Sequence, residues 1–577
     1  MRRVGIAAAF AVAQVMSLAV VLGPVAGKGW FNGFRNYFSN DQLSYAAIAT
    51  NVASGHLELV EPFTRTGSLF YPSLWYQVLG LFSRATGIPI YATWQLLGSL
   101  VVCVLIAFLG WIALRLSRRA WAPILPACAL LLGTLATFTS NYWYTALGNH
   151  AVLWGAFGTF FTLNAEVIGL CLITAALALL LLRATPTNRL NRSIAPFITA
   201  GALIGITGNV QTYSFFTGLT FAAAWAAITG LRQSRSKTRI LITIAVLLLA
   251  LLSGNAIADL LGHIPIYAFV ILAAAPGALV VASRHKKATL AFLIPLAVLA
   301  SPQLIRTAMG LLTKDDFLTY RQASTQNLGV PITSGLIAAL AVILLIITCL
   351  IGLRGAKCNA MTSLLLAGAA SWVILSTNDR WGFSQEPYRF WLEGFIVNGL
   401  LAATLLPAAI SAYRERSKRT PVFPIIAAMT LVIALVSALD VPGWWRFAHD
   451  QGVLDTTTSR MMAIAEITEG REGLIAAAPC IDPRALKLVT DAPVAHYNAG
   501  LAWPENPDSI KILLDPDRRN IGDPVALRTA GAQFVVADSA CADQWVFVPQ
   551  DRITQINEIS YEQEGQQASI TLLQILP

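Results

Sequence analysis

The sequence predicts a polytopic α-helical membrane protein that ends in a small α/β domain, and three observations support this class. The 577 residues are 56% hydrophobic and only 12% charged, with a mean hydropathy of +0.63. A soluble domain carries about twice that charged fraction. Several apolar runs also reach the roughly 20 residues that cross a bilayer: residues 4–26, 90–116, 240–261 and 334–353. Finally, charged residues return in the tail, residues 440–577.

The distribution of charge indicates how the chain crosses the membrane. The formal net charge is +10, but residues 440–577 hold 19 of the 30 acidic and 10 of the 40 basic residues, which leaves a net charge of +19 on residues 1–439. This basic excess lies between the apolar runs, as the positive-inside rule requires of cytoplasmic loops, and argues against a nucleic-acid partner. The basic clusters lie at residues 115–119, 183–192, 232–239, 284–287, 354–357 and 414–419.

Placing each basic cluster in the cytoplasm gives about 13 spans, with the amino terminus inside and the tail outside. Arg2 and Arg3 precede the first apolar run, which we interpret as a retained signal anchor because it is long and further spans follow. We therefore expect a multi-pass protein of the plasma (inner) membrane, in contact with membrane lipids. Residues 1–439 are its predicted transmembrane domain, and residues 440–577 its extracytoplasmic α/β domain.

Two of the seven cysteines, Cys480 and Cys541, lie in the tail, whereas the other five are in or beside apolar runs. Disulfides persist in oxidising, outward-facing compartments, so we predict that Cys480 and Cys541 pair. Spacing alone does not bring two thiols together, and two separate buried thiols are the alternative.

Three predicted outer segments are longer than simple turns: residues 27–89, 302–333 and 377–391. Loops of that length are usually functional. In the first, residues 41–54 have helical periodicity and are followed by Gly55, as by a C-cap glycine. Residues 71–82 form a second short apolar stretch, begun by Pro72. Both stretches are too short to span, so we expect helices at the outer membrane surface.

The tail shows short β-rich runs that alternate with helix-compatible stretches, as in a small α/β domain. The predicted strands are residues 473–477, 493–497, 510–514, 533–537 and 568–573. The predicted helices are residues 483–489 and 524–529. The tail sequence contains neither a glycine-rich phosphate loop nor a compact His/Cys group with metal-ligand spacing.

Asp41 is the first candidate catalytic residue. It follows the first span in the segment FSNDQ and begins a predicted surface helix, so its carboxylate is expected at the boundary between water and lipid headgroups. Helix capping is the alternative role for Asn40 or Asp41, because Asn and Asp are favoured N-caps.

From Asn40 the chain reads NDQLSYAAIATNVASGHLELVEPFTRTGSLFYPSLWYQVLG. This segment resembles the first outer loop of the GT-C glycosyltransferases, in which an acidic residue, often one of a DD, DE or ED pair, follows the first span. Many actinobacterial cell-envelope members then show Asn-x3-Gly and a Pro-Ser/Leu-Leu-Trp-type segment. The residues in those places here are Asn51, Gly55, Gly67, Pro72, Ser73, Leu74 and Trp75.

The resemblance covers roughly the first 80 residues by motif and the rest of the chain by architecture. The chain departs from the family at the acidic pair, which here is Asn40-Asp41 and supplies only one carboxylate. This departure weakens a metal site built on the pair. We assign no metal ligand and no certain cofactor, and the need for a divalent cation is left open.

The resemblance implies transfer of a sugar from polyprenyl phosphate, with inversion, at the outer membrane face. Asp41 would be the general base that deprotonates an acceptor hydroxyl. The leaving phosphate needs fixed cations, and guanidinium groups bind phosphate oxygens bidentately. The candidate donor-phosphate ligands are Arg306, Arg380 and Arg389. Candidate substrate contacts are Asn40, Arg65, Trp75, His150, Glu386 and Tyr388.

Arg380 and Arg389 both lie within the segment TNDRWGFSQEPYRFWLEG, which packs polar and aromatic residues between two spans. Such a cluster is costly at membrane depth unless it lines a cavity. Internal ion pairs, or a place in the headgroup belt, are the alternatives to substrate binding.

We therefore expect a glycosyltransferase that moves a sugar from a polyprenyl-phosphate donor to a cell-envelope glycan or glycolipid. The resemblance points to arabinofuranose or mannose as the sugar. The main alternative is a transporter or flippase of a lipid-linked intermediate, but transporters usually place ionisable features near the midplane of two related halves. A non-catalytic envelope scaffold is the third possibility, because the second acid is missing.

Overall fold

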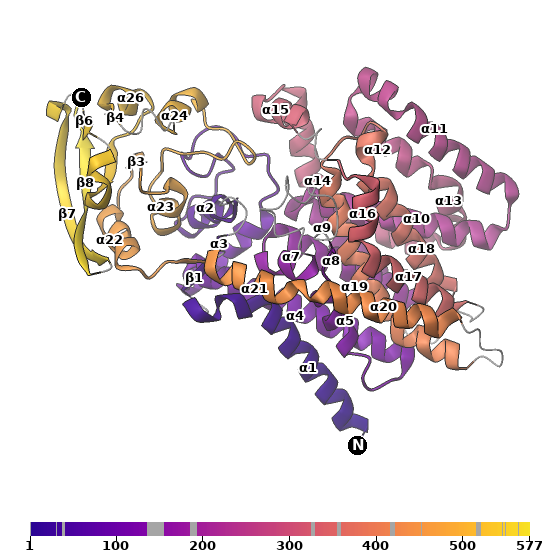
Figure 1. The fold of residues 1–577 in the computed structure, drawn as a ribbon. Helices are drawn as coiled ribbons and strands as arrows, with labels where there is room; N and C mark the ends of the chain where they lie inside the picture. Colours follow the sequence, from indigo (N-terminus) through magenta and orange to yellow (C-terminus); the bar gives the residue numbers. More distant parts are fainter. Residues whose placement is uncertain are drawn as a thin grey trace. The chain divides into compact units, whose positions relative to one another are not determined.

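A computed structural model of the chain describes residues 2–29, 32–36, 41–135, 155–184, 193–324, 329–354, 359–415, 422–451, 453–514, 521–544, 546–547, 550–563 and 565–577. The fold is mainly helical (Figure 1). Two of the predicted substrate contacts, Asn40 and His150, lie outside these residues.

The helices confirm the predicted class of multi-pass membrane protein. In the described part of the chain, nine helices are long and apolar enough to cross a bilayer, and two bent helix pairs raise the number to 11. The bent pairs are Pro265–Leu272 with Ala275–Arg284 and Ile332–Ala338 with Leu340–Leu353. The sequence-based number of about 13 spans stays a prediction, since this search covers the described residues alone.

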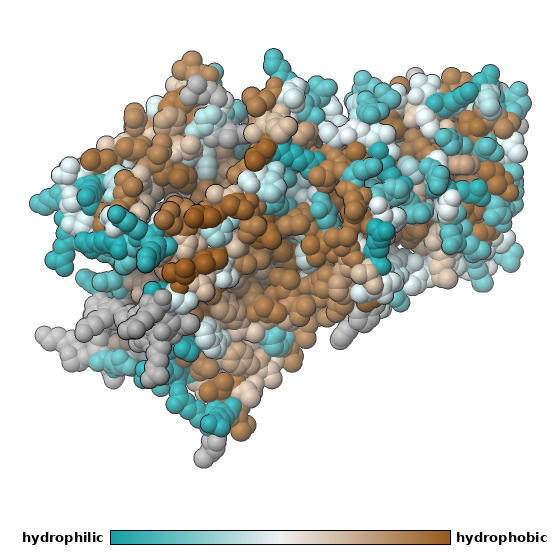
Figure 2. Space-filling view, turned by 180° about the vertical axis from the view of Figure 1, so that it is seen from behind, coloured by the Kyte–Doolittle hydropathy of each residue, from teal (hydrophilic) through white to brown (hydrophobic). Residues whose placement is uncertain are grey.

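Large apolar side chains lie on the outside of these helices, as contact with lipid requires. On Lys237–Leu261, for example, Leu241, Leu249 and Leu252 are 66%, 65% and 84% exposed. Figure 2 shows apolar side chains, in brown, gathered over much of one face of the molecule. An apolar surface of this extent is typical of a protein that is embedded in a membrane.

The first of two compact units comprises Met1–Pro24, Gly98–Met309 and Tyr320–Arg446. Within it, α19 packs against α8, α10, α17 and α18. The helices that lie wholly or mainly in this unit are α1 (Arg2–Leu22), α4 (Ile90–Ser117), α5 (Ile124–Cys128), η2 (Ala129–Leu131), α7 (Ala156–Thr162), α8 (Ala165–Ala184), α9 (Ala195–Val210), α10 (Thr212–Ser234), α11 (Lys237–Leu261), α12 (His263–Leu272), α13 (Ala275–Arg284), α14 (Lys286–Leu312), α15 (Asp316–Ser324), α16 (Ile332–Ala338), α17 (Leu340–Leu353), α18 (Asn359–Ser376), η6 (Asn378–Arg380), α19 (Pro387–Arg414), α20 (Val422–Ala438) and α21 (Asp440–Gln451).

The second compact unit comprises Val25–Leu97, Gly310–Thr319 and Phe447–Pro577. Its elements are η1 (Gly23–Lys28), β1 (Gly33–Arg35), α2 (Asp41–Ala53), α3 (Leu74–Thr86), β2 (Val453–Asp455), α22 (Ser459–Thr468), β3 (Ile475–Ala477), α23 (Pro483–Val489), α24 (Pro507–Leu514), β4 (Ile521–Gly522), α26 (Pro524–Thr529), β5 (Phe534–Asp538), η7 (Ser539–Gln544), β6 (Val546–Phe547), η8 (Gln550–Arg552), β7 (Ile553–Gln563) and β8 (Gln566–Ile575).

A four-stranded sheet organises this second unit, in the order β3-β5-β8-β7. β3 and β5 run parallel, whereas β5 with β8 and β8 with β7 are antiparallel. Helix α22 packs against the β7–β8 hairpin, which forms one edge of the sheet in Figure 1. Separately, β1 pairs antiparallel with β2, and β4 pairs in parallel with β6.

The tail does not form a compact unit alone. Ala47 of α2 and Phe63 belong to the same buried apolar cluster as the tail residues Ile464, Ile475 and Leu486. The compact division therefore differs from the boundary predicted between residues 439 and 440. A boundary drawn from hydropathy separates apolar from polar sequence, whereas this cluster joins the first long loop to the tail.

Most of the predicted tail elements are present. The strands predicted at residues 473–477, 533–537 and 568–573 correspond to β3, β5 and β8, respectively. The two predicted helices are α23 and α26. The longest strand, β7, has the polar sequence ITQINEISYEQ and was not predicted, because it shows no regular apolar alternation.

Two predicted tail strands are wrong. Residues 510–514 belong to helix α24, where Ile510, Leu513 and Leu514 recur at helical spacing and join one apolar cluster. Pro507 begins this helix, as suits a first helical position. The other prediction, residues 493–497, forms only an isolated bridge between Val494 and Ile475.

The predicted outer segment 302–333 is not one loop, because α14 continues through Pro302 to Leu312. A proline inside a helix leaves the carbonyl four residues earlier without its usual donor. Here Ser301 Oγ donates to that carbonyl of Val298 at 2.9 Å. Beside it, the Asn209 side chain accepts from Gln303 N at 3.2 Å, so neighbouring polar groups satisfy the backbone around the proline.

Both predicted helices of the first long loop are present, with one shifted start. Helix α2 (Asp41–Ala53) ends just before Gly55, whose φ of +97° is in the left-handed region favoured by glycine. Helix α3 begins at Leu74 after the N-cap residue Ser73, so Pro72 precedes the helix instead of starting it.

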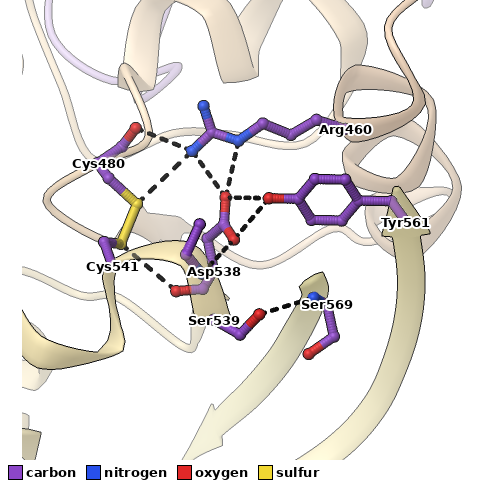
Figure 3. Close-up of a disulfide and its surroundings, with 8 residues drawn as sticks. Arg460, Cys480, Asp538, Ser539, Cys541, Tyr561 and Ser569 are labelled. Carbon is purple, nitrogen blue, oxygen red and sulfur yellow. Dashed lines mark hydrogen bonds and ion pairs between the residues drawn. A yellow bond between two sulfur atoms is a disulfide. The ribbon is translucent and has the colours of Figure 1, made fainter. Parts of the chain in front are cut away.

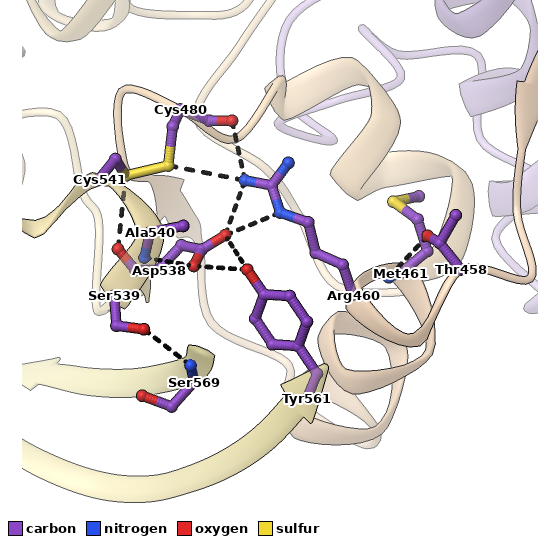
Figure 4. A network of polar contacts seen from close by, with 10 residues as sticks. All are labelled: Thr458, Arg460, Met461, Cys480, Asp538, Ser539, Ala540, Cys541, Tyr561 and Ser569. Atoms are coloured by element: carbon purple, nitrogen blue, oxygen red, sulfur yellow. Dashed lines mark hydrogen bonds and ion pairs between the residues drawn. A yellow bond between two sulfur atoms is a disulfide. The ribbon is translucent and has the colours of Figure 1, made fainter. Parts of the chain in front are cut away.

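Cys480 and Cys541 are joined by a disulfide, with Cα atoms 5.9 Å apart (Figure 3). Arg460 lies beside it and donates from Nη2 to the Cys480 carbonyl at 3.0 Å and from Nε to Asp538 Oδ2 at 2.7 Å. Tyr561 Oη donates to Asp538 Oδ1 at 2.9 Å (Figure 4). The buried charge of Asp538 is therefore paired and hydrogen-bonded, and this network joins α22, β5 and β7.

Removing the disulfide is expected to destabilise the second unit. Cys541→Ala opens a link between residues 61 positions apart, and links of this kind contribute about 2–4 kcal/mol. Thermal unfolding of the purified protein should give a lower midpoint for Cys541→Ala, and reductant should lower the wild-type midpoint to a similar value. The control Cys103→Ser changes a free cysteine and should keep the response to reductant. Equal wild-type midpoints with and without reductant would contradict this expectation.

Candidate functional site

Asp41 lies in the first turn of α2 and is partly buried. Asn498 of the tail donates a hydrogen bond from Nδ2 to Asp41 Oδ1 at 3.2 Å. The same nitrogen donates to Ser44 Oγ, one helical turn further along α2, at 3.1 Å. These three side chains form a small polar site to which the first long loop and the tail both contribute.

A row of aromatic rings continues from this site. The ring of Tyr45 stacks on that of Tyr71 with centroids 5.4 Å apart and on that of Tyr76 at 5.1 Å. The Tyr76 ring lies 5.4 Å from that of Trp94. Since side chains at positions i and i+4 share a helix face, Tyr45 lies on the same face of α2 as Asp41. Tyr45 and Tyr71 are partly exposed, whereas Tyr76 is fully buried.

Asn51 ties α2 to the loop that follows. Its Nδ2 donates to the Pro62 carbonyl at 2.7 Å, and its Oδ1 accepts from Arg65 Nε at 3.2 Å. The Arg65 guanidinium also lies 2.9 Å from His56 Nε2. With Gly55 at the end of the helix, Asn51 fixes the turn, which gives the Asn-x3-Gly pattern a structural role here.

The loop after α2 folds around the carboxylate of Glu61, which is 0% exposed. It accepts hydrogen bonds from Phe63 N, Thr64 N and Thr64 Oγ1 at 2.7–3.1 Å. Burial nevertheless raises the pKa of Glu61 to about 7. Lys487 of the tail is also buried, and burial lowers the pKa of its ammonium group well below the usual value. Attraction between Glu61 and Lys487 opposes both shifts.

The tail segment of residues 494–505 contacts residues 61–68, which we call the docking loop. Val494 N donates to the Phe63 carbonyl at 2.8 Å. The ring of His496 meets the Phe63 ring edge to face, with centroids 4.7 Å apart. Backbone and ring contacts therefore anchor the start of this tail segment.

The far end of this tail segment packs against Gly67 of the docking loop. Gly67 has a φ of +66°, and a Cβ at this position would overlap the carbonyl oxygen of Trp503. Ser68 forms an antiparallel bridge with Trp503, and Glu505 N donates to Thr66 Oγ1 at 3.2 Å. Both the positive φ and the close approach of the two backbones require glycine at residue 67.

In the first unit, Arg389 lies at the start of α19 within a cluster of buried charges. Its Nε pairs with Glu386, and its Nη1 lies 3.6 Å from Glu166 Oε2. Arg321 Nη2 pairs with Glu386 Oε1 at 3.3 Å. The side chains of Glu166 and Glu386 are only 4% and 7% exposed. Two guanidinium groups thus balance two carboxylates, which is the internal ion pairing that the sequence left open.

The backbone of Glu386 has φ 33° and ψ 67°, in the left-handed region where non-glycine residues are uncommon. This conformation is the N-cap of α19 and places the carboxylate between Arg321 and Arg389. Rings of Tyr213 and Tyr388 lie 5.4 Å and 5.5 Å from the Arg389 guanidinium carbon. Strain and dense pairing at one point are typical of functional sites.

Glu393 lies one helical turn beyond Arg389 and is 0% exposed. Ser214 Oγ donates to its Oε1 at 2.6 Å, and Thr217 Oγ1 donates to its Oε2. Each carboxylate oxygen therefore has a hydroxyl donor from α10, as a buried polar group at membrane depth requires.

Arg380 and Arg306 have different surroundings from Arg389. Arg380 is exposed at the end of η6, and its backbone carbonyl accepts from Asn255 Nδ2 at 3.2 Å. The loop packs closely on α11, since a Cβ at Gly254 would overlap the Trp381 carbonyl oxygen. Arg306 is partly buried within helix α14, and not in a loop after it.

The structure thus brings together only some of the predicted site residues. Glu386, Tyr388 and Arg389 meet in the first unit. Arg65 and Trp75 lie in the second unit, where Arg65 bonds to Asn51 and His56 and Trp75 is 6% exposed on α3.

Asn498 and Arg321 were missed as site residues. Asn498 lies 457 positions from Asp41, and no sequence spacing links the two residues. Arg321 is one of several basic residues on predicted outer segments, and nothing in its local sequence marks it as a partner of Glu386. The polar run HYNAG between apolar stretches was the available signal for Asn498.

Within the described ranges, no three His, Cys, Asp or Glu side chains come together in a way that could hold a metal ion. The site around Asp41 combines the carboxylate of Asp41 with the side-chain amide of Asn498 and the hydroxyl group of Ser44. Such a set offers few of the oxygen ligands that a divalent cation takes.

No protein-family model and no curated protein matches the sequence. Among solved structures, a variant of the arabinofuranosyltransferase AftD from Mycobacteria matches over 100% of this chain and 42% of that chain, with 14% identity and a TM-score of 0.50. The chain spans about two fifths of that enzyme's length. At 14% identity this likeness concerns the fold alone. It agrees with the GT-C-like fold that the resemblance of the first long loop predicts.

Two further structures have lower scores. The oligosaccharyltransferase AglB from Archaeoglobus fulgidus, in complex with an inhibitory peptide and a dolichol-phosphate, matches over 92% of this chain and 69% of that chain, with 12% identity and a TM-score of 0.49. ArnT from Cupriavidus metallidurans bound to undecaprenyl phosphate matches over 98% and 97%, with 12% identity and a TM-score of 0.44. Scores below 0.5 do not establish a shared fold.

The Arg389 cluster is expected to be essential for stability. Arg389→Ala leaves the carboxylates of Glu386 and Glu166 buried without this partner, and breaking a buried pair in this way costs about 3–5 kcal/mol. Thermal unfolding in detergent should show a large fall in midpoint, and a second change, Glu386→Gln, should recover part of it. Arg380→Ala, at an exposed position, is the control and should have little effect. A wild-type midpoint for Arg389→Ala would refute the role.

The raised pKa of Glu61 gives a pH-dependent contribution to stability. The pKa of Glu61 is about 7 in the folded chain against an ordinary value of 4.5. Between pH 4.5 and about 7 the folded chain therefore binds more protons than the unfolded chain. Stability should therefore fall as pH rises from 4.5 to about 7, by on the order of 3 kcal/mol for this group. Unfolding midpoints measured across this range should show a shallower slope in Glu61→Gln, while the exposed control Glu58→Gln should keep the wild-type slope.

Proposed function

We propose that this chain is a polyprenyl-phosphate-dependent glycosyltransferase in which Asp41 is the general base. The observation that carries the proposal is the ordered carboxylate of Asp41, partly buried, held by Asn498 and followed on the same helix face by Tyr45. The likeness of fold to an arabinofuranosyltransferase supports the class of reaction. The resemblance of the first long loop to GT-C enzymes supports the role of this acid.

In the proposed reaction, Asp41 accepts the proton of an acceptor hydroxyl as the hydroxyl oxygen attacks the anomeric carbon of the donor sugar. The bond between that carbon and the donor phosphate oxygen breaks, and polyprenyl phosphate leaves with the bonding electron pair. A single displacement of this kind inverts the configuration of the anomeric carbon. The partly exposed rings of Tyr45 and Tyr71 offer apolar faces on which a sugar ring can pack.

Arg306, Arg380 and Arg389 are the proposed contacts to the donor phosphate. Among them Arg380 is the strongest candidate, because its side chain is exposed and a guanidinium binds phosphate oxygens bidentately. Arg389 already balances Glu386 and Glu166, so a phosphate bound there would add negative charge to a neutral cluster. We therefore rank Arg389 below Arg380 as a ligand of the donor phosphate. Arg306, which is partly buried, ranks between them.

The nature of the substrates follows from the sequence resemblance. We propose arabinofuranose or mannose as the transferred sugar, and a cell-envelope glycan or glycolipid as the acceptor. The charge distribution supports a place in the plasma (inner) membrane, with the amino terminus in the cytoplasm and the tail outside. Transfer then takes place on the outer face.

Asp41→Asn is expected to lower transfer by about 10²–10⁴-fold, the usual contribution of a general base. The measurement is sugar transfer by purified enzyme from a defined polyprenyl-phosphate sugar, with membrane level and unfolding midpoint as controls for folding. Asp508→Asn makes the same chemical change at an exposed tail position and should retain wild-type activity. Full transfer by Asp41→Asn would show that Asp41 is not the base, and no transfer by the wild type from any such donor would favour a flippase or scaffold.

A further inference from the structure

Two segments 457 positions apart meet at the carboxylate of Asp41. α2 contributes Asp41 and Ser44, and the tail contributes Asn498, whose Nδ2 lies 3.2 Å from Asp41 Oδ1 and 3.1 Å from Ser44 Oγ. The tail is therefore part of the candidate base site, and it supplies the site with a neutral donor.

The orientation of the Asn498 amide is fixed by the tail itself. Its Oδ1 accepts from Gly500 N at 2.9 Å, and its backbone carbonyl accepts from Leu501 N at 2.8 Å and Ala502 N at 3.2 Å. Because the backbone N–H of Gly500 must face the amide oxygen, the amide nitrogen is the atom that faces Asp41. A reversed amide would place two acceptors against each other at Asp41 and two donors at Gly500.

The segment that carries Asn498 is anchored on both sides by the docking loop. Val494 bonds to the Phe63 carbonyl before Asn498, and Trp503 bridges to Ser68 after it. At Gly67 the two backbones approach so closely that a side chain on this residue would overlap the Trp503 carbonyl oxygen. The position of Asn498 is thus set by contacts that are independent of Asp41.

We propose that Asn498 is a positioning residue that holds the carboxylate of Asp41 in one orientation for proton transfer. This inference rests on the proposed function, in which Asp41 is the base. A base must be held within hydrogen-bond reach of the hydroxyl that it deprotonates. An amide donor fixes the carboxylate without the full charge of Lys or Arg, which would weaken it as a base. The role of the tail in the reaction is then to complete the base site.

Two variants test the role. Asn498→Ala removes the donor, and we expect the kcat for transfer to fall about 10–100-fold while the KM for donor changes less than about twofold. Asn498→Asp keeps the size but places a second carboxylate beside Asp41, which favours protonation of the pair. The acidic limb of the kcat profile against pH should move upward by about one unit or more.

The matched control is Asn506→Asp, the same change at an exposed position of the same tail. It should leave both kcat and the pH profile at their wild-type values. A merely structural role for Asn498 predicts loss of activity in proportion to loss of folded protein, with an unmoved acidic limb. An unmoved limb in folded Asn498→Asp, or wild-type kcat in Asn498→Ala, would overturn the inference.

The two proposals fail in different ways. If Asp41→Asn is active, the base assignment fails, and the inference about Asn498 fails with it. If Asp41→Asn is inactive while Asn498→Asp keeps the wild-type profile, the base stands and only the positioning role is refuted. Should Asn498→Asp not fold, the kcat and KM of Asn498→Ala decide, since a donor removed without added charge must still lower kcat.

Discussion

The contact between the docking loop and the tail segment of residues 494–505 is the constraint on which the candidate base site depends. Gly67 lets two backbones approach, and Phe63 and Val494 form a backbone hydrogen bond. The same loop closes around the buried carboxylate of Glu61 and is tied to α2 through Asn51. A carboxylate on a helix surface is otherwise free to rotate in water, and this framework gives the Asp41 carboxylate a partner from the tail.

Buried charge in the first unit follows a different principle. Two guanidinium groups balance the carboxylates of Glu386 and Glu166, and the buried carboxylate of Glu393 accepts hydrogen bonds from two hydroxyl groups instead. Such clusters are costly to form, and replacement by apolar side chains often costs nothing in stability. The left-handed backbone of Glu386 adds local strain at the same point.

The sequence predicted the features that depend on local or one-dimensional patterns. Long apolar runs identified the membrane class, Gly55 marked the end of α2, and Pro483–Val489 had the composition of a helix. Features that depend on distant residues were missed or misjudged. Residues 510–514 were apolar enough for a strand, but packing of one helix face decided their structure. An outer segment was predicted to begin at residue 302, and only the side chains around Pro302 explain why α14 continues. Asn498 could not be linked to Asp41, since their proximity comes from tertiary contacts alone.

Whether Asp41 meets the acceptor hydroxyl can be seen in an experimental structure of the protein with a non-transferable polyprenyl-phosphate sugar and an acceptor. We expect an acceptor hydroxyl within about 2.6–3.2 Å of an Asp41 oxygen, with the Asn498 amide still bonded to the same carboxylate. An acceptor bound in a productive pose with its reacting hydroxyl beyond the reach of Asp41, directly or through one water, would show that Asp41 is not the base.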